Sequence, residues 1–168
     1  VTELAATATP QGVVAVCQMV DLPASEVLAG KPRLVVLCDQ VRDPGNLGTV
    51  IRCADAFGAD AVLVSRASVD LYNAKTVRAT TGSLFHLPLA VGVDLAKAVT
   101  MARDSGLQVF GGDSRASRTI DQLAQSGELA QPTMWVLGNE AWGLQPDHTA
   151  LLDRLVAGGI DPGRLMPG

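Results

Sequence analysis

Residues 39–58, DQVRDPGNLGTVIRCADAFG, decide how this chain of 168 residues folds. The stretch begins where the apolar run Leu34–Cys38, which predicts a buried strand, comes to an end. A turn signal at 43–45 is followed by apolar residues at helical spacing, and Gly58 is expected to end that helix. The apolar run 61–64 predicts the next strand. Short connections between these elements predict two parallel strands with a right-handed helical crossover.

Two polar residues of the predicted helix suggest chemistry. Asn46 is the expected N-cap, at a helix entrance where free backbone N–H groups favour anions. Arg52 follows Gly48 by one turn, and we expect the glycine to leave open space beside the guanidinium for a phosphate or ribose. The simpler alternative, that Asn46 only caps the helix and Arg52 is only solvated, stays open. The apolar face of this helix is expected to consist of Leu47, Val50, Ile51, Ala54 and Phe57.

The composition limits the class of protein. Hydrophobic residues make up 48% of the chain and charged residues 18%, below the roughly 25% charged residues of an ordinary soluble domain. We therefore expect one domain that buries apolar surface against a partner. The net charge of −4 excludes a chain-wide basic footprint, so any contact with nucleic acid needs a local patch. The sequence shows neither a signal peptide nor an apolar run of membrane-spanning length, which favours a cytoplasmic protein.

The cysteines and histidines do not predict a metal site. Cys17, Cys38 and Cys53 have no CxxC spacing and lie among apolar neighbours, which predicts buried free thiols. His86 lies in an apolar run and is expected in the core or half-buried, whereas His148 is expected on the surface of a helix. Two histidines without clustered carboxylates give no ligand set for a metal ion.

The rest of the chain alternates predicted strands and helices, which favours an α/β domain with a mainly parallel sheet and helices on both faces. We expect a linker or lead-in loop at 1–12, the domain at 13–156 and a Gly- and Pro-rich tail at 157–168. Strands are predicted at 12–20, 34–38, 61–64, 107–110, 133–137 and 154–156, and helices at 25–28, 47–57, 73–79, 95–105 and 120–124.

A second glycine-bounded loop lies where parallel sheets bind ligands. The sequence LGNEAWGL at 137–144 directly follows the predicted strand 133–137, at the carboxyl edge of the sheet. Glu140 in this loop can accept hydrogen bonds from a ligand or hold a neighbouring arginine. The alternative is that Glu140 is only a carboxylate in the first turn of a helix.

Together the two stretches resemble the SpoU (TrmH-like) branch of the SPOUT RNA methyltransferases. DPxNxGxxxRxAxAFG occupies 43–58, LGNExxGL occupies 137–144, and the match extends through PQG at 10–12 and ATTGSLFHLP at 79–88, so that it spans about residues 9–156. The resemblance implies the SPOUT (α/β knot) fold and a homodimer, with Trp142 as a candidate contact. It also implies methyl transfer from S-adenosylmethionine to a ribose 2′-hydroxyl of ribosomal or transfer RNA.

The resemblance implies roles for individual residues. Arg52 is the expected catalytic residue, Asn46 supports it, and Glu140 belongs to the site. A guanidinium rarely gives up its proton, so we expect Arg52 to position the RNA and stabilise charge rather than act as a general base. The cofactor is expected to contact Leu137, Gly138, Asn139, Glu140, Thr81, Gly82, Gly111 and Gly112, and the RNA is expected to contact Arg42, Arg52, Arg115 and Arg118.

The match stops before a third motif of the family, IPxxGxxxSLN. Residues 157–168 are AGGIDPGRLMPG, and no Ser or Asn occurs after Asn139. We therefore expect an incomplete C-terminal knot element, and a catalytically inactive SpoU-like RNA-binding or interaction module is the alternative function. A dinucleotide-dependent oxidoreductase is disfavoured because the first loop lacks GxGxxG.

Overall fold

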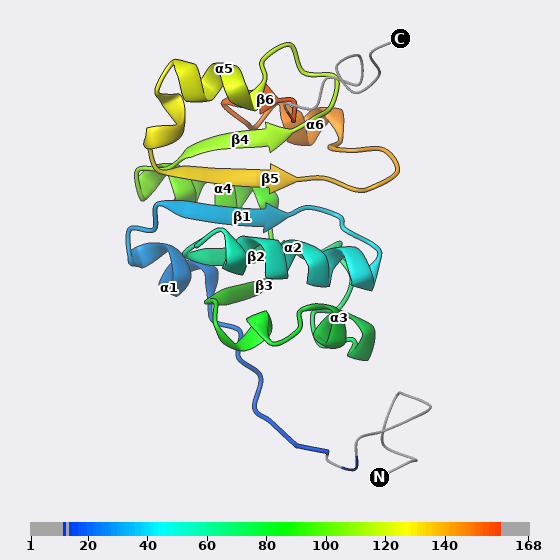
Figure 1. Ribbon diagram of the computed structural model, residues 1–168. Helices are drawn as coiled ribbons and strands as arrows, with labels where there is room; N and C mark the ends of the chain where they lie inside the picture. The colour runs from blue at the N-terminus through cyan, green and yellow to red at the C-terminus, as the bar shows by residue number, and fades with distance from the viewer. Residues whose placement is uncertain (1–11, 13, 159–168) are drawn as a thin grey trace.

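The structure, a computed structural model, describes residue 12 and residues 14–158, and its centre is a six-stranded sheet (Figure 1). The strand order is β3-β2-β1-β5-β4-β6, and every neighbouring pair is parallel. The predicted α/β class with a parallel sheet is therefore confirmed. The strands are β1 (Leu34–Cys38), β2 (Ala61–Ser65), β3 (Leu89–Val93), β4 (Gln108–Gly112), β5 (Thr133–Leu137) and β6 (Arg154–Val156).

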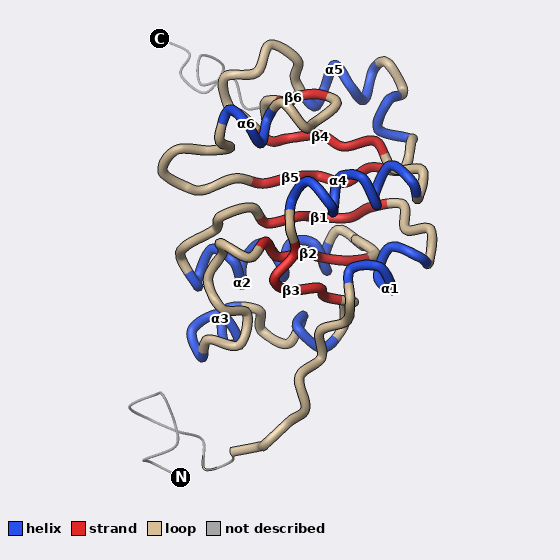
Figure 2. The backbone as a smooth tube through the Cα atoms, turned by 180° about the vertical axis from the view of Figure 1, so that it is seen from behind, coloured by secondary structure: helices blue, strands red, loops and turns tan. Residues whose placement is uncertain are grey.

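Helices cover both faces of the sheet (Figures 1 and 2). One face is covered by α1 (Ala24–Ala29) and α4 (Leu95–Asp104). The other is covered by α2 (Pro44–Ala56), with α3 (Ala74–Ala79) packed beside it, and by α5 (Ile120–Gln125). The short helix α6 (Pro146–Thr149) and the 3₁₀ turns η1 (Ser83–Phe85) and η2 (Glu128–Ala130) complete the described elements.

The alternation of side chains along β1 explains why this strand lies in the middle of the sheet. Val35 and Leu37 are fully buried on the face covered by α1 and α4. Cys38 is fully buried on the opposite face, in the core cluster that includes α2. Successive side chains of a strand point to opposite faces, so a strand that is apolar on both sides requires a cover on each.

Helix α2 begins earlier than expected, because Asp43 and not Asn46 is its N-cap. The carboxylate of Asp43 accepts a hydrogen bond from the backbone N–H of Asn46 at 2.9 Å, which places Asn46 in the first turn. Pro44 suits the first helical position because its missing N–H would have no partner there. Gly58, with φ of +70°, follows the helix as expected. Phe57 is 81% exposed, contrary to expectation, because it is the C-cap and lies beyond the buried face.

Gly48 is needed for helix packing, and the expectation that it leaves open space beside Arg52 is wrong. Gly48 is buried, and a Cβ atom at this position would lie 2.5 Å from the Cβ of Ala79 and 2.8 Å from the carbonyl oxygen of Thr76. The missing side chain therefore lets α3 approach the backbone of α2, and no room for a ligand remains there.

The predicted strand at 12–20 is absent from the described part of that range. Residues 14–20 have no regular structure, and Val16 and Met19 are 101% and 74% exposed, so nothing described buries their apolar side chains. The chain first meets the sheet at Asp21, which forms an isolated parallel bridge with Leu89 of β3. Most of the expected lead-in segment (1–12) and tail (157–168), including the expected incomplete knot element, lies outside the described residues.

We predict that Gly48→Ala lowers the free energy of unfolding by about 1–3 kcal/mol, because the added methyl group overpacks the contact between α2 and α3. Alanine is otherwise the better helix former, so the loss would reverse the usual effect of this change. Gly30→Ala is the matched control, since Gly30 has φ of −70° and no atom within 4 Å of the added Cβ. Urea unfolding of the three proteins measures both changes, and equal stability would contradict the packing role of Gly48.

Candidate active site

The candidate site lies at the carboxyl edge of the sheet, where β1 and β5 are neighbours. The chain leaves β1 through α2 on one face, whereas α6 and β6 follow β5, so the two connections diverge here (Figure 1). Such a point is where open parallel sheets bind ligands. The loops after the two strands are joined: the N–H of Asp39 donates to the carbonyl of Leu137 at 2.8 Å, and the side-chain amide of Asn139 donates to the carbonyl of Gln40 at 2.9 Å.

Residues 137–144, called the LGNE loop below, form a tight turn because of two glycines. Asn139 and Gly143 exchange backbone hydrogen bonds of 3.1 and 2.8 Å, and Gly143 has φ of +73°. A Cβ atom at Gly138 would lie 2.5 Å from the carbonyl carbon of Gly143. Asn139 is buried, and its side-chain oxygen accepts from the N–H of Ala141 at 2.8 Å. The Asn139 side chain therefore holds the loop together, with both its nitrogen and its oxygen in hydrogen bonds to the backbone.

A cavity of about 570 Å³ opens beside the LGNE loop. This volume is within the range of small-molecule sites. Of the residues expected to contact a cofactor, Gly112, Asn139 and Glu140 line the cavity, and Leu137 and Gly138 form the base of the loop next to it. The other lining residues are Asp113, Ser114, Arg115, Ala141, Trp142 and Gly143.

Three residues expected to contact the cofactor do not line this cavity. Gly111 is buried, and a Cβ atom there would lie 2.5 Å from Leu152 and 2.8 Å from Leu144, so this glycine serves core packing. Thr81 and Gly82 lie between α3 and η1 and do not line the cavity. The sequence could not distinguish Gly111, which the core packing requires, from Gly112, which lines the cavity. A position on a strand does not reveal which face of the sheet the residue occupies.

An ion pair marks the β4 side of the cavity. The guanidinium of Arg115 donates to both oxygens of the Asp113 carboxylate, each at 3.1 Å. The hydrogen bonds from Arg115 hold the pKa of Asp113 below its usual range. The Arg115 side chain is 78% exposed, so its remaining donors face solvent at the edge of the cavity.

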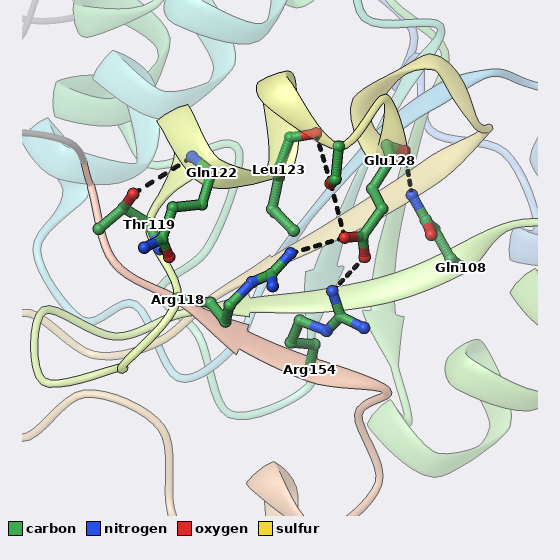
Figure 3. Close-up of polar contacts among 8 residues, drawn as sticks. Gln108, Arg118, Thr119, Gln122, Leu123, Glu128 and Arg154 are labelled. Atoms are coloured by element: carbon green, nitrogen blue, oxygen red, sulfur yellow. Dashed lines mark hydrogen bonds and ion pairs between the residues drawn. The ribbon is translucent and has the colours of Figure 1, made fainter.

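Arg118 belongs to a different environment, shown in Figure 3. The Glu128 carboxylate accepts from Arg118 at 2.7 Å, from Ser126 at 2.7 Å and from Arg154. Hydrogen bonding by Ser126 and the charges of the two arginines lower the pKa of Glu128. This cluster ties the segment after α5 to β6, and the Glu128 carbonyl also accepts from Gln108 of β4 at 2.9 Å. Arg118 therefore already has a structural partner.

Three residues are expected to be catalytic, and the structure leaves all of them exposed. Asn46 and Arg52 lie six positions apart on α2, which separates them by about 9 Å along the helix axis and about 120° around it. Among the described residues, no hydrogen bond joins Arg52, Asn46 and Glu140 to one another. Arg42 is also exposed, on the loop that leads from β1 into α2. Arg42 and Asn46 thus lie near the start of α2 at the carboxyl edge of the sheet, whereas Arg52 lies about two turns further along the helix, and none of these residues is in direct contact with Glu140.

Cys38 shows that Glu140 lies near the end of β1. Burial raises the pKa of the Cys38 thiol to about 12, with further contributions from the negative charges of Glu140 and Asp39. The hydrogen bonds from Asp39 to Leu137 and from Asn139 to Gln40 bring the LGNE loop beside the end of β1, although the two are far apart in the sequence.

Both histidines differ from expectation. His86 is exposed, and its Nδ1 lies 2.9 Å from the Asp55 carboxylate of α2. His148 is half-buried, with its side chain 23% exposed, and its Nδ1 lies 2.5 Å from an oxygen of the buried Asp39. The local apolar pattern predicted the wrong burial for both histidines. The position of each side chain depends on a carboxylate that is distant in the sequence. His148 and Asp39 also line a second cavity, of about 360 Å³.

Two further observations concern only residues 12 and 14–158. Within this part of the chain no three His, Cys, Asp or Glu side chains are grouped so as to hold a metal ion. None of its helices has the length and hydropathy needed to cross a bilayer.

Comparison with known proteins shows which family has this parallel fold with two loops joined at one edge of the sheet. The chain belongs to the SpoU rRNA methylase family, whose model matches residues 33–157. It is 39% identical over 148 residues to the 23S rRNA (guanosine(2553)-2'-O)-methyltransferase RlmP of Bacillus subtilis, covering 88% of this chain and 54% of that protein. It is 34% identical over 154 residues to a 23S rRNA (uridine(2479)-2'-O)-methyltransferase of Streptomyces viridochromogenes, covering 88% and 52%.

Solved structures agree with the family assignment. An AdoMet-bound rRNA methyltransferase from Sinorhizobium meliloti superimposes with a TM-score of 0.71 at 30% identity, covering 84% of this chain and 52% of that one. The SpoU methyltransferase AviRb from Streptomyces viridochromogenes, in complex with AdoMet, gives 0.67 at 33% identity, covering 80% and 49%. The chain thus spans about half the length of these relatives.

We predict that the three cysteines react very differently with thiol reagents. Cys38 is buried with a pKa of about 12, so its reactive thiolate is scarce near neutral pH. Cys17 and Cys53 are free and exposed, contrary to the expected burial, and both will be alkylated. Mass spectrometry after brief iodoacetamide treatment at pH 8 should locate adducts on Cys17 and Cys53 in the native protein, and on all three in urea. Modification of native Cys38 at the rate of Cys53 would contradict the described packing.

Proposed function

We propose that this chain is the methyltransferase domain of an RNA 2′-O-ribose methyltransferase that uses S-adenosylmethionine and acts on ribosomal or transfer RNA. The observation that supports this most is the joining of the two family motifs at one sheet edge, through the Asn139–Gln40 hydrogen bond. The names of the relatives favour ribosomal RNA. By analogy with the bacterial relatives, we propose that the protein acts in the cytoplasm.

The cavity beside the LGNE loop is the proposed cofactor site. Its volume of about 570 Å³ suits a nucleoside-sized molecule, and the glycines at 112 and 143 keep backbone groups accessible. Glu140 is exposed there and offers an acceptor for ribose hydroxyls. When bound, S-adenosylmethionine supplies a methyl group activated by its positively charged sulfur. Relatives crystallised with AdoMet support this cofactor.

The proposed reaction is a direct displacement. A bond forms between the ribose 2′-oxygen and the methyl carbon, the carbon–sulfur bond breaks with its electron pair going to sulfur, and the hydroxyl proton passes to solvent. Because this chemistry mainly needs alignment, positioning can account for much of the rate. In this chain Arg52 would hold the adjoining RNA phosphate and stabilise charge, with Asn46 as a second polar contact.

The exposure of the predicted catalytic residues favours an active enzyme over an inactive binding module. Arg52, Asn46 and Glu140 are all present and exposed, and Arg52 has no hydrogen-bond or ion-pair partner among the described residues. An exposed cation without a protein partner is free to bind phosphate. For RNA contact we therefore propose Arg42 and Arg52. We add Arg115, which is paired with Asp113 but has a side chain that is 78% exposed, with donors left over, whereas the pairing of Arg118 with Glu128 argues for a structural role.

We predict that Arg52→Ala lowers single-turnover methylation by roughly 100-fold or more, because it removes charge stabilisation used in the reaction. The affinity for S-adenosylmethionine should stay nearly unchanged, since the cofactor is itself cationic at sulfur. Arg52→Lys should rescue poorly, because one ammonium does not reproduce a two-pronged grip on phosphate. Calorimetry with S-adenosylmethionine and methyl transfer to unmethylated 23S rRNA transcribed in vitro are the two measurements.

Lys97→Ala is the control for loss of a positive charge, since Lys97 is exposed on α4, which covers the opposite face of the sheet from α2. It should leave both measurements unchanged. Near-normal turnover of Arg52→Ala would remove Arg52 from the mechanism. Absence of S-adenosylmethionine binding by the unaltered protein would contradict the proposed function itself.

We also propose that the protein acts as a homodimer. Trp142 is 49% exposed on the LGNE loop, and Phe57 and Phe85 are 81% and 60% exposed, which leaves large aromatic surface uncovered in the single chain. We predict a dimer in sedimentation equilibrium at micromolar concentration, and Trp142→Ala should weaken it. A monomer at all concentrations tested would contradict this proposal.

A further inference from the structure

Asp39 is the one charged side chain that is buried among the described residues. It is 3% exposed and directly follows β1. A buried carboxylate is unfavourable unless a hydrogen-bonding partner compensates for its lost hydration. Its partner is His148 of α6, whose Nδ1 lies 2.5 Å from Oδ2 of Asp39. This pair, called the Asp39–His148 link below, connects residues 109 positions apart in the sequence.

The loop after β1 is held firmly on its own side of this link. The backbone N–H of Asp39 donates to Leu137 of β5 at 2.8 Å, and the N–H of Gln40 donates to the hydroxyl of Ser65 at 3.0 Å. Gln40 has φ of +56°, a left-handed conformation that persists only where surrounding contacts fix it. Asp39 therefore presents its carboxylate from a rigid base.

Helix α6 depends much more on this contact. It has only four residues, too few for a helix to be stable by itself. In the described part of the chain, His148 makes the only side-chain hydrogen bond that leads from α6 to another element, since Thr149 bonds back to Pro146 within the helix. The Asp39–His148 link therefore fixes α6 to the loop after β1, in addition to the apolar contacts that Leu144, Leu151 and Leu152 make with the core on either side of the helix.

The LGNE loop is consequently tied at both ends to adjacent residues of the loop after β1. At its start, Asn139 donates to the carbonyl of Gln40 at 2.9 Å. Beyond its end, His148 binds Asp39. Glu140 and Trp142 lie between these two attachments and line the cavity of about 570 Å³. Moving either attachment would move this wall of the cavity.

We propose that His148 is a positioning residue for the cofactor site, acting through Asp39 to fix the LGNE loop relative to the loop that leads into α2. This inference rests on the proposed function for its effect on S-adenosylmethionine, but not for its effect on the loop. A merely structural histidine would influence stability alone. A positioning histidine changes the loop in the folded protein.

The two tryptophans of the chain allow a direct test in the absence of cofactor. Trp142 lies in the LGNE loop and Trp135 in β5, so fluorine NMR of protein labelled with 5-fluorotryptophan reports the loop and the sheet separately. In His148→Leu we expect the Trp142 signal to shift and broaden while the Trp135 signal stays in place. In His148→Asn the side-chain amide can still donate to Asp39, so the Trp142 signal should stay close to that of the unaltered protein.

The affinity for S-adenosylmethionine is the second measurement. His148→Leu should weaken it roughly tenfold, the effect expected for leaving a buried group unsatisfied beside the site, and His148→Asn should restore most of it. Thr149→Ala is the matched control, because it removes a hydrogen bond inside α6 and leaves the Asp39–His148 link intact. It should change neither the spectra nor the affinity.

An unchanged Trp142 signal in folded His148→Leu would overturn the proposal, and so would a His148→Asn variant as impaired as His148→Leu. If His148→Leu fails to fold, the double variant Asp39→Leu/His148→Leu takes its place, since it leaves no buried carboxylate without a partner. It should keep the Trp135 signal and lose the native Trp142 signal, and retention of both would overturn the proposal. Absence of cofactor binding by the unaltered protein would contradict the proposed function, while the fluorine spectra would still decide the role of His148.

Discussion

The pairing of β1 with β5 is the constraint on which the rest of the site depends. It brings the strand before α2 next to the strand before the LGNE loop, although the two are separated by the whole of β2, β3 and β4. The ladder continues one residue beyond the strands, where the N–H of Asp39 donates to Leu137. The two motifs lie side by side only because their strands are neighbours in a parallel sheet.

Around this pairing, side chains that look functional in sequence divide into two kinds. Asn139, Gly138 and Gly48 determine the backbone geometry. The Asn139 amide donates a hydrogen bond from one loop to the other, and the two glycines allow close backbone contacts. Arg52 and Glu140 stay exposed, with their charged groups available to a ligand. Both kinds of residue occur in the same motifs, because a reactive group is useful only when the backbone that presents it is held in place.

Much of the fold was predictable from the sequence because its signals are local. The apolar run 133–137 and the helical spacing after Pro44 predict β5 and α2 directly, and the glycine at 58 predicts the end of the helix. Within α2 the prediction of Asn46 as the cap was wrong, because Asp43 is an equally suitable residue type and lies at the position where the helix begins. The two motifs also predicted the family.

Other wrong predictions have a different cause, which is dependence on contacts between distant parts of the chain. The space beside Gly48 is filled by Ala79 of another helix, and the environment of His148 is decided by Asp39. The segment 14–20 has the apolar composition of a strand but lacks a partner in the described structure. No periodicity within one segment contains this information.

The hydrogen bond between Asn139 and Gln40 joins residues 99 positions apart, and this separation has a consequence for biosynthesis. Closing so long a loop costs entropy before any favourable contact is made, so pairing of this kind forms late in folding. While the chain is being synthesised, β1 can pair with β5 only after β5 has left the ribosome. The ligand site is therefore among the last parts of the protein to exist, and a nascent chain stopped before residue 133 would have the first motif with nothing to pair it to.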